Sequence, residues 1–122
     1  MKRRLAALLA VLVLGTAVPA LSGEVPAVPA PGMVTMVDLG AKACVPCKMM
    51  QPVLASVEAR YAGRAAILFI DVWENRDEPR KYGLRVIPTQ IFYDKTGKEV
   101  SRHEGFLDEK PMADILDRLL AE

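Results

Sequence analysis

The chain has two cysteines, Cys44 and Cys47, in the stretch KACVPCKMMQP, and only Val45 and Pro46 stand between them. Such a pair can hold a metal, close a structural disulfide, or exchange disulfides with other proteins. A C-x-x-C disulfide closes a very small ring, so its stabilisation sits at the low end of a range of about 0–5 kcal/mol. The spacing therefore favours reversible disulfide exchange over a structural cross-link.

The residues that follow the first cysteine predict a helix over residues 45–62, ended by Gly63. Unpaired N–H groups and the helix dipole favour an anion at the start of a helix, which is where Cys44 stands. Because a thiolate is the nucleophile in disulfide exchange, we expect Cys44 to attack and the less exposed Cys47 to resolve the mixed disulfide. The apolar residues that carry this helix recur at helical spacing: Val53, Leu54, Val57 and Tyr61.

The remaining elements must position this turn, and their order predicts an α/β fold. The first two expected strands are nearly continuous apolar runs, which is typical of parallel strands joined by a crossover helix. The last two flank DKTG and predict an antiparallel hairpin. We therefore expect a four-stranded mixed sheet, a parallel pair plus the hairpin, with helices on both faces and strand 65–72 at an exposed edge. Strands are expected over 33–40, 65–72, 89–94 and 98–105, and further helices over 76–83 and 108–122, the latter capped by Asp108.

The first 32 residues do not resemble the rest of the chain. A basic start (Lys2, Arg3 and Arg4), an apolar run over 5–18 and small residues near position 22 predict a signal peptide over 1–22. The apolar run is shorter than the roughly 20 residues of a membrane span, although an uncleaved anchor stays open as an alternative. A Pro- and Ala-rich linker is expected over 23–32 and the domain over 33–122. Export, for instance to the periplasm, would let disulfides form and persist.

Charge excludes one class of partner. Removal of the signal peptide leaves 13 of the 16 basic residues against 15 acidic ones, a net charge of −2. A chain without a basic excess is a poor ligand for nucleic acid. We expect a monomer that acts on proteins and uses no cofactor or metal.

Residues 33–122 resemble the thioredoxin superfamily, and the matches occur in the same order. C-x-P-C-K followed 41 residues later by Ile-Pro-Thr is the most specific of them, and IPTQIFYDKTGKEV looks like small exported bacterial thioredoxins. The resemblance implies a minimal thioredoxin fold. The matching features are Asp38 in the first strand, CVPCK at the strand-to-helix turn, Pro52 kinking the helix, KYGLRVIPT over 81–89, and Gly105.

The resemblance also implies roles for individual residues. Asp38 would be a buried acid behind Cys47 that moves its proton through water, although a strand-end Asp reaching solvent or capping a backbone group stays open. Pro88 would be a cis proline facing the cysteines, whereas a trans proline at a strand start is the ordinary alternative. The backbone of Ile87 would bind the client as an added strand, beside the turn residues Val45 and Pro46.

Two departures from the family pattern concern the same region. Thioredoxins carry Trp directly before the first cysteine, where this chain has Ala43. A lysine common on the second strand is replaced by Ile67 or Leu68, which should alter the titration of Asp38. We hypothesise that the single tryptophan, Trp73, covers the surface that Ala43 leaves open. The alternative is a core or loop role for Trp73.

Together these features predict an exported thiol-disulfide oxidoreductase, acting as a reductant on client proteins. An exported reductant needs electrons from across the membrane, so an integral-membrane thiol donor is an expected partner. The alternative is a metal-binding module resembling a copper chaperone. Two thiolates and His103 give at most three ligands, whereas Zn²⁺ takes four. We expect His103 to be a plain surface residue, and Met49 and Met50 to be packing residues.

Overall fold

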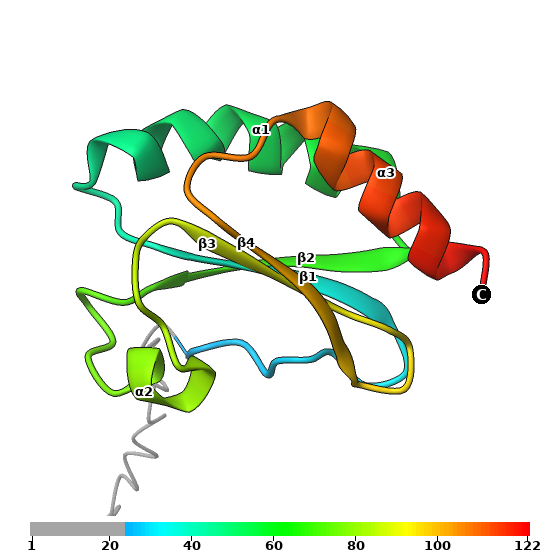
Figure 1. Cartoon of the computed structure of the whole chain (residues 1–122), viewed down its shortest axis with the longest axis horizontal. Coiled ribbons are helices and arrows are strands. Elements are labelled where there is room, and N and C mark those ends of the chain that lie inside the picture. The colour runs from blue at the N-terminus through cyan, green and yellow to red at the C-terminus, as the bar shows by residue number, and fades with distance from the viewer. Residues whose placement is uncertain (1–23) are drawn as a thin grey trace, which may run out of the picture.

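The computed structural model describes residues 24–122 (Figure 1). The predicted signal peptide, residues 1–22, lies outside the described residues. All seven expected elements are present in the expected order. They are β1 (Val34–Gly40), α1 (Val45–Tyr61), β2 (Ala65–Asp71), α2 (Glu78–Tyr82), β3 (Thr89–Tyr93), β4 (Glu99–Glu104) and α3 (Glu109–Leu120).

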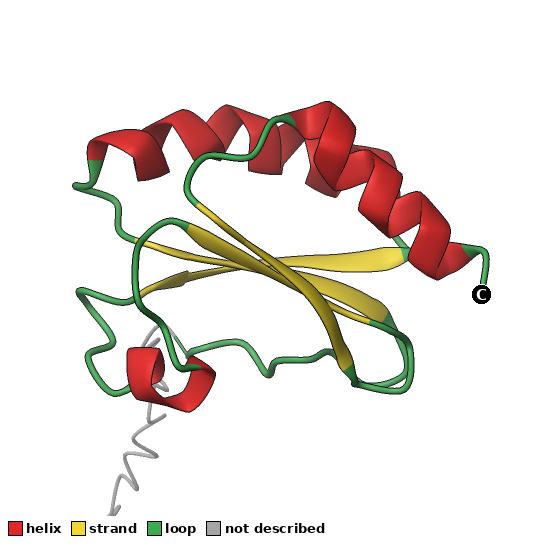
Figure 2. Ribbon diagram, in the orientation of Figure 1, coloured by secondary structure: helices red, strands yellow, loops and turns green. Residues whose placement is uncertain are grey.

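The four strands form one mixed sheet in the order β2-β1-β3-β4. β1 runs parallel to β2 and antiparallel to β3, and β3 and β4 form the antiparallel hairpin. α1 and α3 cover one face of the sheet, and α2 lies on the other (Figures 1 and 2). The predicted fold class is therefore confirmed. β1 is buried along its whole length, whereas the middle of β2 is partly exposed because β2 is an edge strand.

Alternation along β1 divides the core between the two faces of the sheet. Met36 packs beneath α1 and α3 in a cluster that includes Met50, Tyr61, Phe92, Met112 and Leu116. Val37 and Leu39 point the other way, into a cluster with Ile70 and Ile91 that Tyr82 and Leu84 cover. Because side chains two apart in a strand share a face, Asp38 and Gly40 lie on the α1 side with Met36.

The segment before β1 is less of a free linker than its proline content predicts. Residues 24–32 contain no helix or strand, but Val25 and Val28 pack against the core on the α2 face. Figure 1 shows the segment running along that face. Part of the expected linker thus belongs to the packed domain. Its first residues, Glu24, Val25 and Pro26, also line a cavity beside β2, together with Lys42, Asp71, Glu74 and Asn75.

The two long helices begin and end at residues that suit those positions. The N–H of Glu109 donates to Oδ1 of Asp108, the expected cap of α3, at 2.8 Å. Pro52 lies inside α1, and Gly63 follows its end with a φ of 76°, a value that favours glycine. Within residues 24–122, neither of these helices nor α2 is long and apolar enough to cross a membrane.

Candidate active site

The two cysteines lie where β1 gives way to α1, and they form a disulfide with their Cα atoms 5.1 Å apart. Cys44 is the N-cap of α1, and its Sγ accepts a hydrogen bond from the N–H of Cys47 at 3.3 Å. Cys44 is 8% exposed, whereas Cys47 is fully buried. The structure therefore places the sulfur expected to attack nearer the surface, at the end of the helix where N–H groups favour negative charge.

Backbone hydrogen bonds hold this turn on both sides of Cys44. Its N–H donates to the carbonyl of Ala41 at 3.2 Å, and its carbonyl accepts from the N–H of Lys48 at 2.9 Å. Pro46 lies in the first turn of α1. An N–H at that position has no partner within the helix, so proline loses little there and its fixed φ suits the turn.

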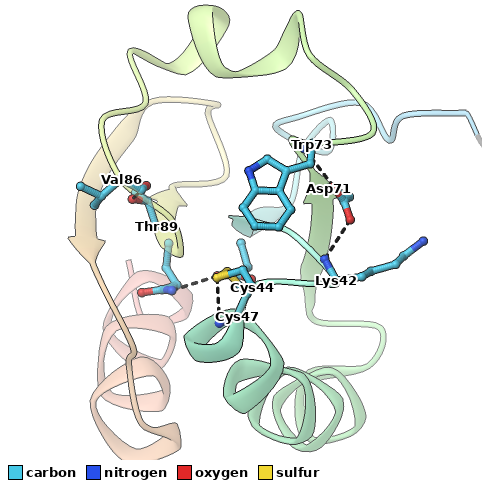
Figure 3. The surroundings of a disulfide bond; sticks show 9 residues. Lys42, Cys44, Cys47, Asp71, Trp73, Val86 and Thr89 are labelled. Atoms are coloured by element: carbon cyan, nitrogen blue, oxygen red, sulfur yellow. Dashed lines mark hydrogen bonds between the residues drawn. A yellow bond between two sulfur atoms is a disulfide. The ribbon is translucent and has the colours of Figure 1, made fainter.

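Asp71, the last residue of β2, ties the cysteine turn to the loop that follows β2. Its Oδ2 accepts from the N–H of Lys42 at 2.9 Å, and its Oδ1 from the N–H groups of Trp73 and Glu74 at 2.9 and 3.0 Å. Figure 3 shows the carboxylate between the two segments. Burial alone would raise the pKa of Asp71, but the three backbone N–H groups outweigh burial and lower the pKa. The ionised carboxylate thus holds two loops together.

Replacing Asp71 with asparagine should loosen this connection. An amide has one acceptor oxygen, so N–H groups now bonded to the carboxylate lose their partner, at a cost of about 1–3 kcal/mol in the free energy of unfolding. Because the folded pKa is lowered, the contribution of Asp71 is present above pH 3.8 and is lost as the pH falls through the folded value. Urea denaturation of both proteins near neutral pH measures the loss.

The matched control for this change is Asp94→Asn. Asp94 accepts from the N–H groups of Thr96 and Lys98 in the distant β3–β4 turn. We expect the control to leave the fluorescence of Trp73 unchanged and Asp71→Asn to shift it. Equal fluorescence spectra for the wild-type protein and Asp71→Asn would show that Asp71 does not position the tryptophan loop.

Trp73 is not a core residue. It is 54% exposed, and its ring points from the loop after β2 toward the cysteine pair (Figure 3). Val45, 70% exposed, and Val86 add further exposed apolar surface near the disulfide. A core role for Trp73 is therefore wrong, and the hypothesis that it covers the surface left open at Ala43 stays a prediction.

The Ile87–Pro88 peptide bond is cis, as the resemblance implied. Ile87 packs against Cys44 and Cys47, and Pro88 is buried. The Pro88 carbonyl accepts from the N–H of Gly105 at 2.7 Å, and Oγ1 of Thr89 donates to the Val86 carbonyl at 2.8 Å. Within residues 24–122, neither backbone group of Ile87 forms a hydrogen bond.

Asp38 is fully buried, so the alternative of a strand-end residue that reaches solvent is wrong. Its Oδ1 accepts from Nε2 of Gln90 at 2.9 Å, and its Oδ2 has no partner among the described residues. Burial raises the pKa of Asp38 to about 6, and the hydrogen bond from Gln90 acts in the opposite direction. On the β2 side its partner is Phe69, with Ile67 on the same face. Of the two candidates for the missing lysine, Ile67 is therefore the one on the same face of the sheet as the acid.

The acid lies close to Cys47 without touching it. A Cβ added to Gly40 would lie 3.3 Å from Sγ of Cys47, so this sulfur packs directly on β1 at Gly40. Asp38 is two residues earlier on the same face, which in a strand is about 6.6 Å away. No hydrogen bond joins the two side chains in the described part of the chain. Transfer of a proton between the two side chains through water stays a prediction.

Three further side chains differ from expectation or were not foreseen: His103, Gln90 and Met49. His103 is half-buried, and its Nδ1 lies 3.1 Å from Oε1 of Gln90. Gln90 itself went unnoticed, because a lone polar residue in an apolar strand gives no signal until its neighbours across the sheet are known. Met50 is buried, and its Sδ accepts from the N–H of Leu107 at 3.4 Å. Met49 is 55% exposed, so the prediction that it packs in the core is wrong.

Among residues 24–122, no three His, Cys, Asp or Glu side chains are grouped to hold a metal.

Comparison with known proteins agrees with this geometry. The Thioredoxin family model matches residues 27–118. Thioredoxin of Staphylococcus aureus (strain Mu50 / ATCC 700699) is 42% identical over 87 residues, which cover 71% of this chain and 83% of the relative, and that of strain MW2 matches equally. A crystal structure of chloroplastic thioredoxin z is 30% identical, with a TM-score of 0.68 over 75% of this chain and 81% of that one. The chain belongs to the thioredoxin family and is a thiol-disulfide oxidoreductase.

Proposed function

We propose that this oxidoreductase is exported and works as a reductant of disulfides in client proteins. The observation that carries the direction of attack is the position of Cys44 as the N-cap of α1, with its Sγ accepting the N–H of Cys47. A hydrogen bond to sulfur at a helix N-terminus stabilises the thiolate. The fully buried Cys47 is shielded from clients and is suited to the second, intramolecular step.

The exchange proceeds in two displacements. The Cys44 thiolate attacks one sulfur of the client disulfide, and the other client sulfur leaves as a thiolate. Cys47 then gives its proton to the Asp38 carboxylate and attacks Sγ of Cys44, which releases the second client thiolate. The client gains two electrons, and the enzyme is left with the Cys44–Cys47 disulfide. A folded pKa of about 6 suits Asp38 to this task, because the carboxylate is ionised at neutral pH yet takes up a proton readily.

The client would bind across the surface around the disulfide. Both backbone groups of Ile87 are free to pair with an extended client segment, as in the addition of a strand to a sheet edge. Pro88 keeps this backbone against the cysteines, and Val45, Pro46 and Trp73 supply exposed surface on the other side of the disulfide. Backbone pairing accepts many sequences, which suits an enzyme with several clients.

Export rests on the basic and apolar start of the chain, and export in turn requires a source of electrons. Outside the cytoplasm the enzyme would be re-reduced by a dithiol of an integral-membrane protein. That dithiol would run the same two displacements in reverse and would itself become a disulfide. The proposed location of the enzyme is therefore the periplasm. Its electron donor would be the membrane thiol carrier, and its clients would be proteins that contain disulfides.

The reduction potential of the Cys44–Cys47 pair tests the proposed direction. The protein is equilibrated with mixtures of reduced and oxidised glutathione, and the fraction reduced is read from the fluorescence of Trp73, the single tryptophan, and checked by thiol labelling. A value near about −270 mV is expected for a reductant, whereas one near about −120 mV would make the protein an oxidant. Export is tested separately, by locating the full chain in cell fractions.

A further inference from the structure

A chain of hydrogen bonds crosses the sheet from the buried acid to the β4 edge. Asp38 on β1 is the direct partner of Gln90 on β3, and Gln90 is the direct partner of His103 on β4. Nε2 of Gln90 donates to Oδ1 of Asp38 at 2.9 Å, and Oε1 of Gln90 lies 3.1 Å from Nδ1 of His103. The three side chains therefore stand side by side on the α1 face of the sheet.

A glutamine amide between an acid and an imidazole can be satisfied in two ways. With Nε2 toward Asp38, the amide donates to the carboxyl and favours its ionised form, and Oε1 accepts from an Nδ1–H of His103. With the amide turned over, Oε1 accepts from a protonated Asp38 and Nε2 donates to a bare Nδ1. An imidazolium carries hydrogen on both nitrogens, so it permits only the first arrangement.

We propose that Gln90 and His103 are positioning residues for Asp38, and that the Gln90 amide transmits the protonation state of His103 to the buried carboxyl. A proton on His103 fixes the amide with its N–H toward Asp38, which favours the carboxylate. That is the form able to take the proton of Cys47, so the inference rests on the role given to Asp38 in the proposed function. The S–H bond of Cys47 breaks and an O–H bond forms on Asp38, while the new Cys47–Cys44 bond displaces the client sulfur.

The surroundings leave few other groups to set the charge of Asp38. The elements packed around it contribute mostly apolar side chains, including Met50 of α1, Ile67 and Phe69 of β2, and Met112 of α3. Its pKa reflects burial first and the Gln90 hydrogen bond second. The charged residues beside His103 on β4 are paired, Arg102 with Glu99 and Glu104 with Arg85, and Cys47 is in the disulfide in the oxidised protein.

The coupling is measured directly by following the Asp38 carboxyl carbon by NMR between pH 4 and pH 9. In Gln90→Leu the carboxylate loses the hydrogen bond from Nε2, so Asp38 should bind protons roughly tenfold more tightly than in the wild-type protein. In His103→Phe the amide is no longer fixed by an imidazolium, and a rise of about threefold is expected. His103→Phe changes a half-buried residue of an edge strand, so it carries the test alone if Gln90→Leu does not fold.

Glu104→Gln is the matched control. It removes a charge next to His103 in sequence, yet its side chain bonds Arg85 and is outside the hydrogen-bond chain. The Asp38 titration should be the same in the control and in the wild-type protein. An Asp38 curve in His103→Phe that superimposes on the wild-type curve would overturn the coupling, as would an equal shift in Glu104→Gln.

Two further readouts separate this inference from the proposed function. Nitrogen-15 chemical shifts of the imidazole report which ring nitrogen carries the proton. The Nδ1–H form should dominate while Asp38 is ionised, and this preference should be lost in Gln90→Leu.

The second readout is the rate of mixed-disulfide resolution as a function of pH. The midpoint of this profile should shift in His103→Phe and should be unchanged in Glu104→Gln. If Asp38→Asn resolves mixed disulfides at the wild-type rate, the proton-acceptor step that the proposed function gives to Asp38 fails, and the present inference fails with it. If Asp38→Asn is slow but His103→Phe has the wild-type profile, only the present inference fails.

Discussion

Replacing Cys44 with serine should abolish disulfide reduction. A serine hydroxyl at the start of α1 is not ionised at neutral pH and cannot form a mixed disulfide, so the turnover of a protein disulfide should fall by at least about a thousandfold, the scale seen when an enzyme loses its nucleophile. The measurement is the dithiothreitol-driven reduction of insulin, followed by turbidity. Serine is close in size to cysteine and is itself a good N-cap, so the fold should survive.

Cys47→Ser is the matched variant, and its expected phenotype is different. Cys44 can still attack, but nothing resolves the product, so the client should stay attached through a disulfide and appear as an added mass on a non-reducing gel. Cys44→Ser and the double variant should attach no client. Trapping by Cys44→Ser and none by Cys47→Ser would mean that the two roles are reversed.

Asp38→Asn should make the protein more stable at pH 8. The folded pKa of about 6 lies above the value of 3.8 for an exposed Asp. The unfolded chain therefore loses its proton first, and stability falls as the pH rises from 3.8 to 6. Above pH 6 the buried charge costs about 3 kcal/mol. Asparagine removes the charge while keeping an oxygen for Gln90, so most of this penalty should be recovered at pH 8 and none at pH 3.5.

Urea denaturation of the oxidised protein at the two pH values measures this difference. Asp114→Asn serves as the control, because Asp114 is an exposed residue that pairs with Lys110 on α3. Its effect should stay within about 0.5 kcal/mol at both pH values. A gain in Asp38→Asn of the same size at pH 3.5 and pH 8 would mean that burial of the charge is not its source.

Local patterns in the sequence were enough to predict the order of elements and the position of the cysteines. Apolar runs marked β1 and β2. Gly83 directly follows α2, and Gly63 follows Ala62, the C-cap of α1. Met49 shows how the pattern could have been used further. The buried residues of α1 recur three or four positions apart, and they are Cys47, Met50, Leu54, Val57 and Tyr61. Met49 is not on this buried face of the helix. The exposure of Met49 was therefore predictable.

What could not be predicted depends on register between strands. Gln90 faces Asp38 because β3 pairs with β1 at one particular alignment, and a shift by one residue would have placed Ile91 there and turned Gln90 to the other face. His103 joins the chain through a second such alignment. The packing of Val25 and Val28 was hidden for another reason: the prolines around them exclude helix and sheet, but they do not prevent apolar side chains from covering a core.

The cavity at the start of the described chain bears on how an anchored form would sit in the cell. Glu24 lines it together with Lys42 and Glu74, which belong to the loops that frame the disulfide. If residues 1–22 were retained as an anchor in a bilayer, the described domain would be joined to that anchor beside these loops. An electron carrier embedded in that bilayer would then need little reach, while large clients would have to approach from the side.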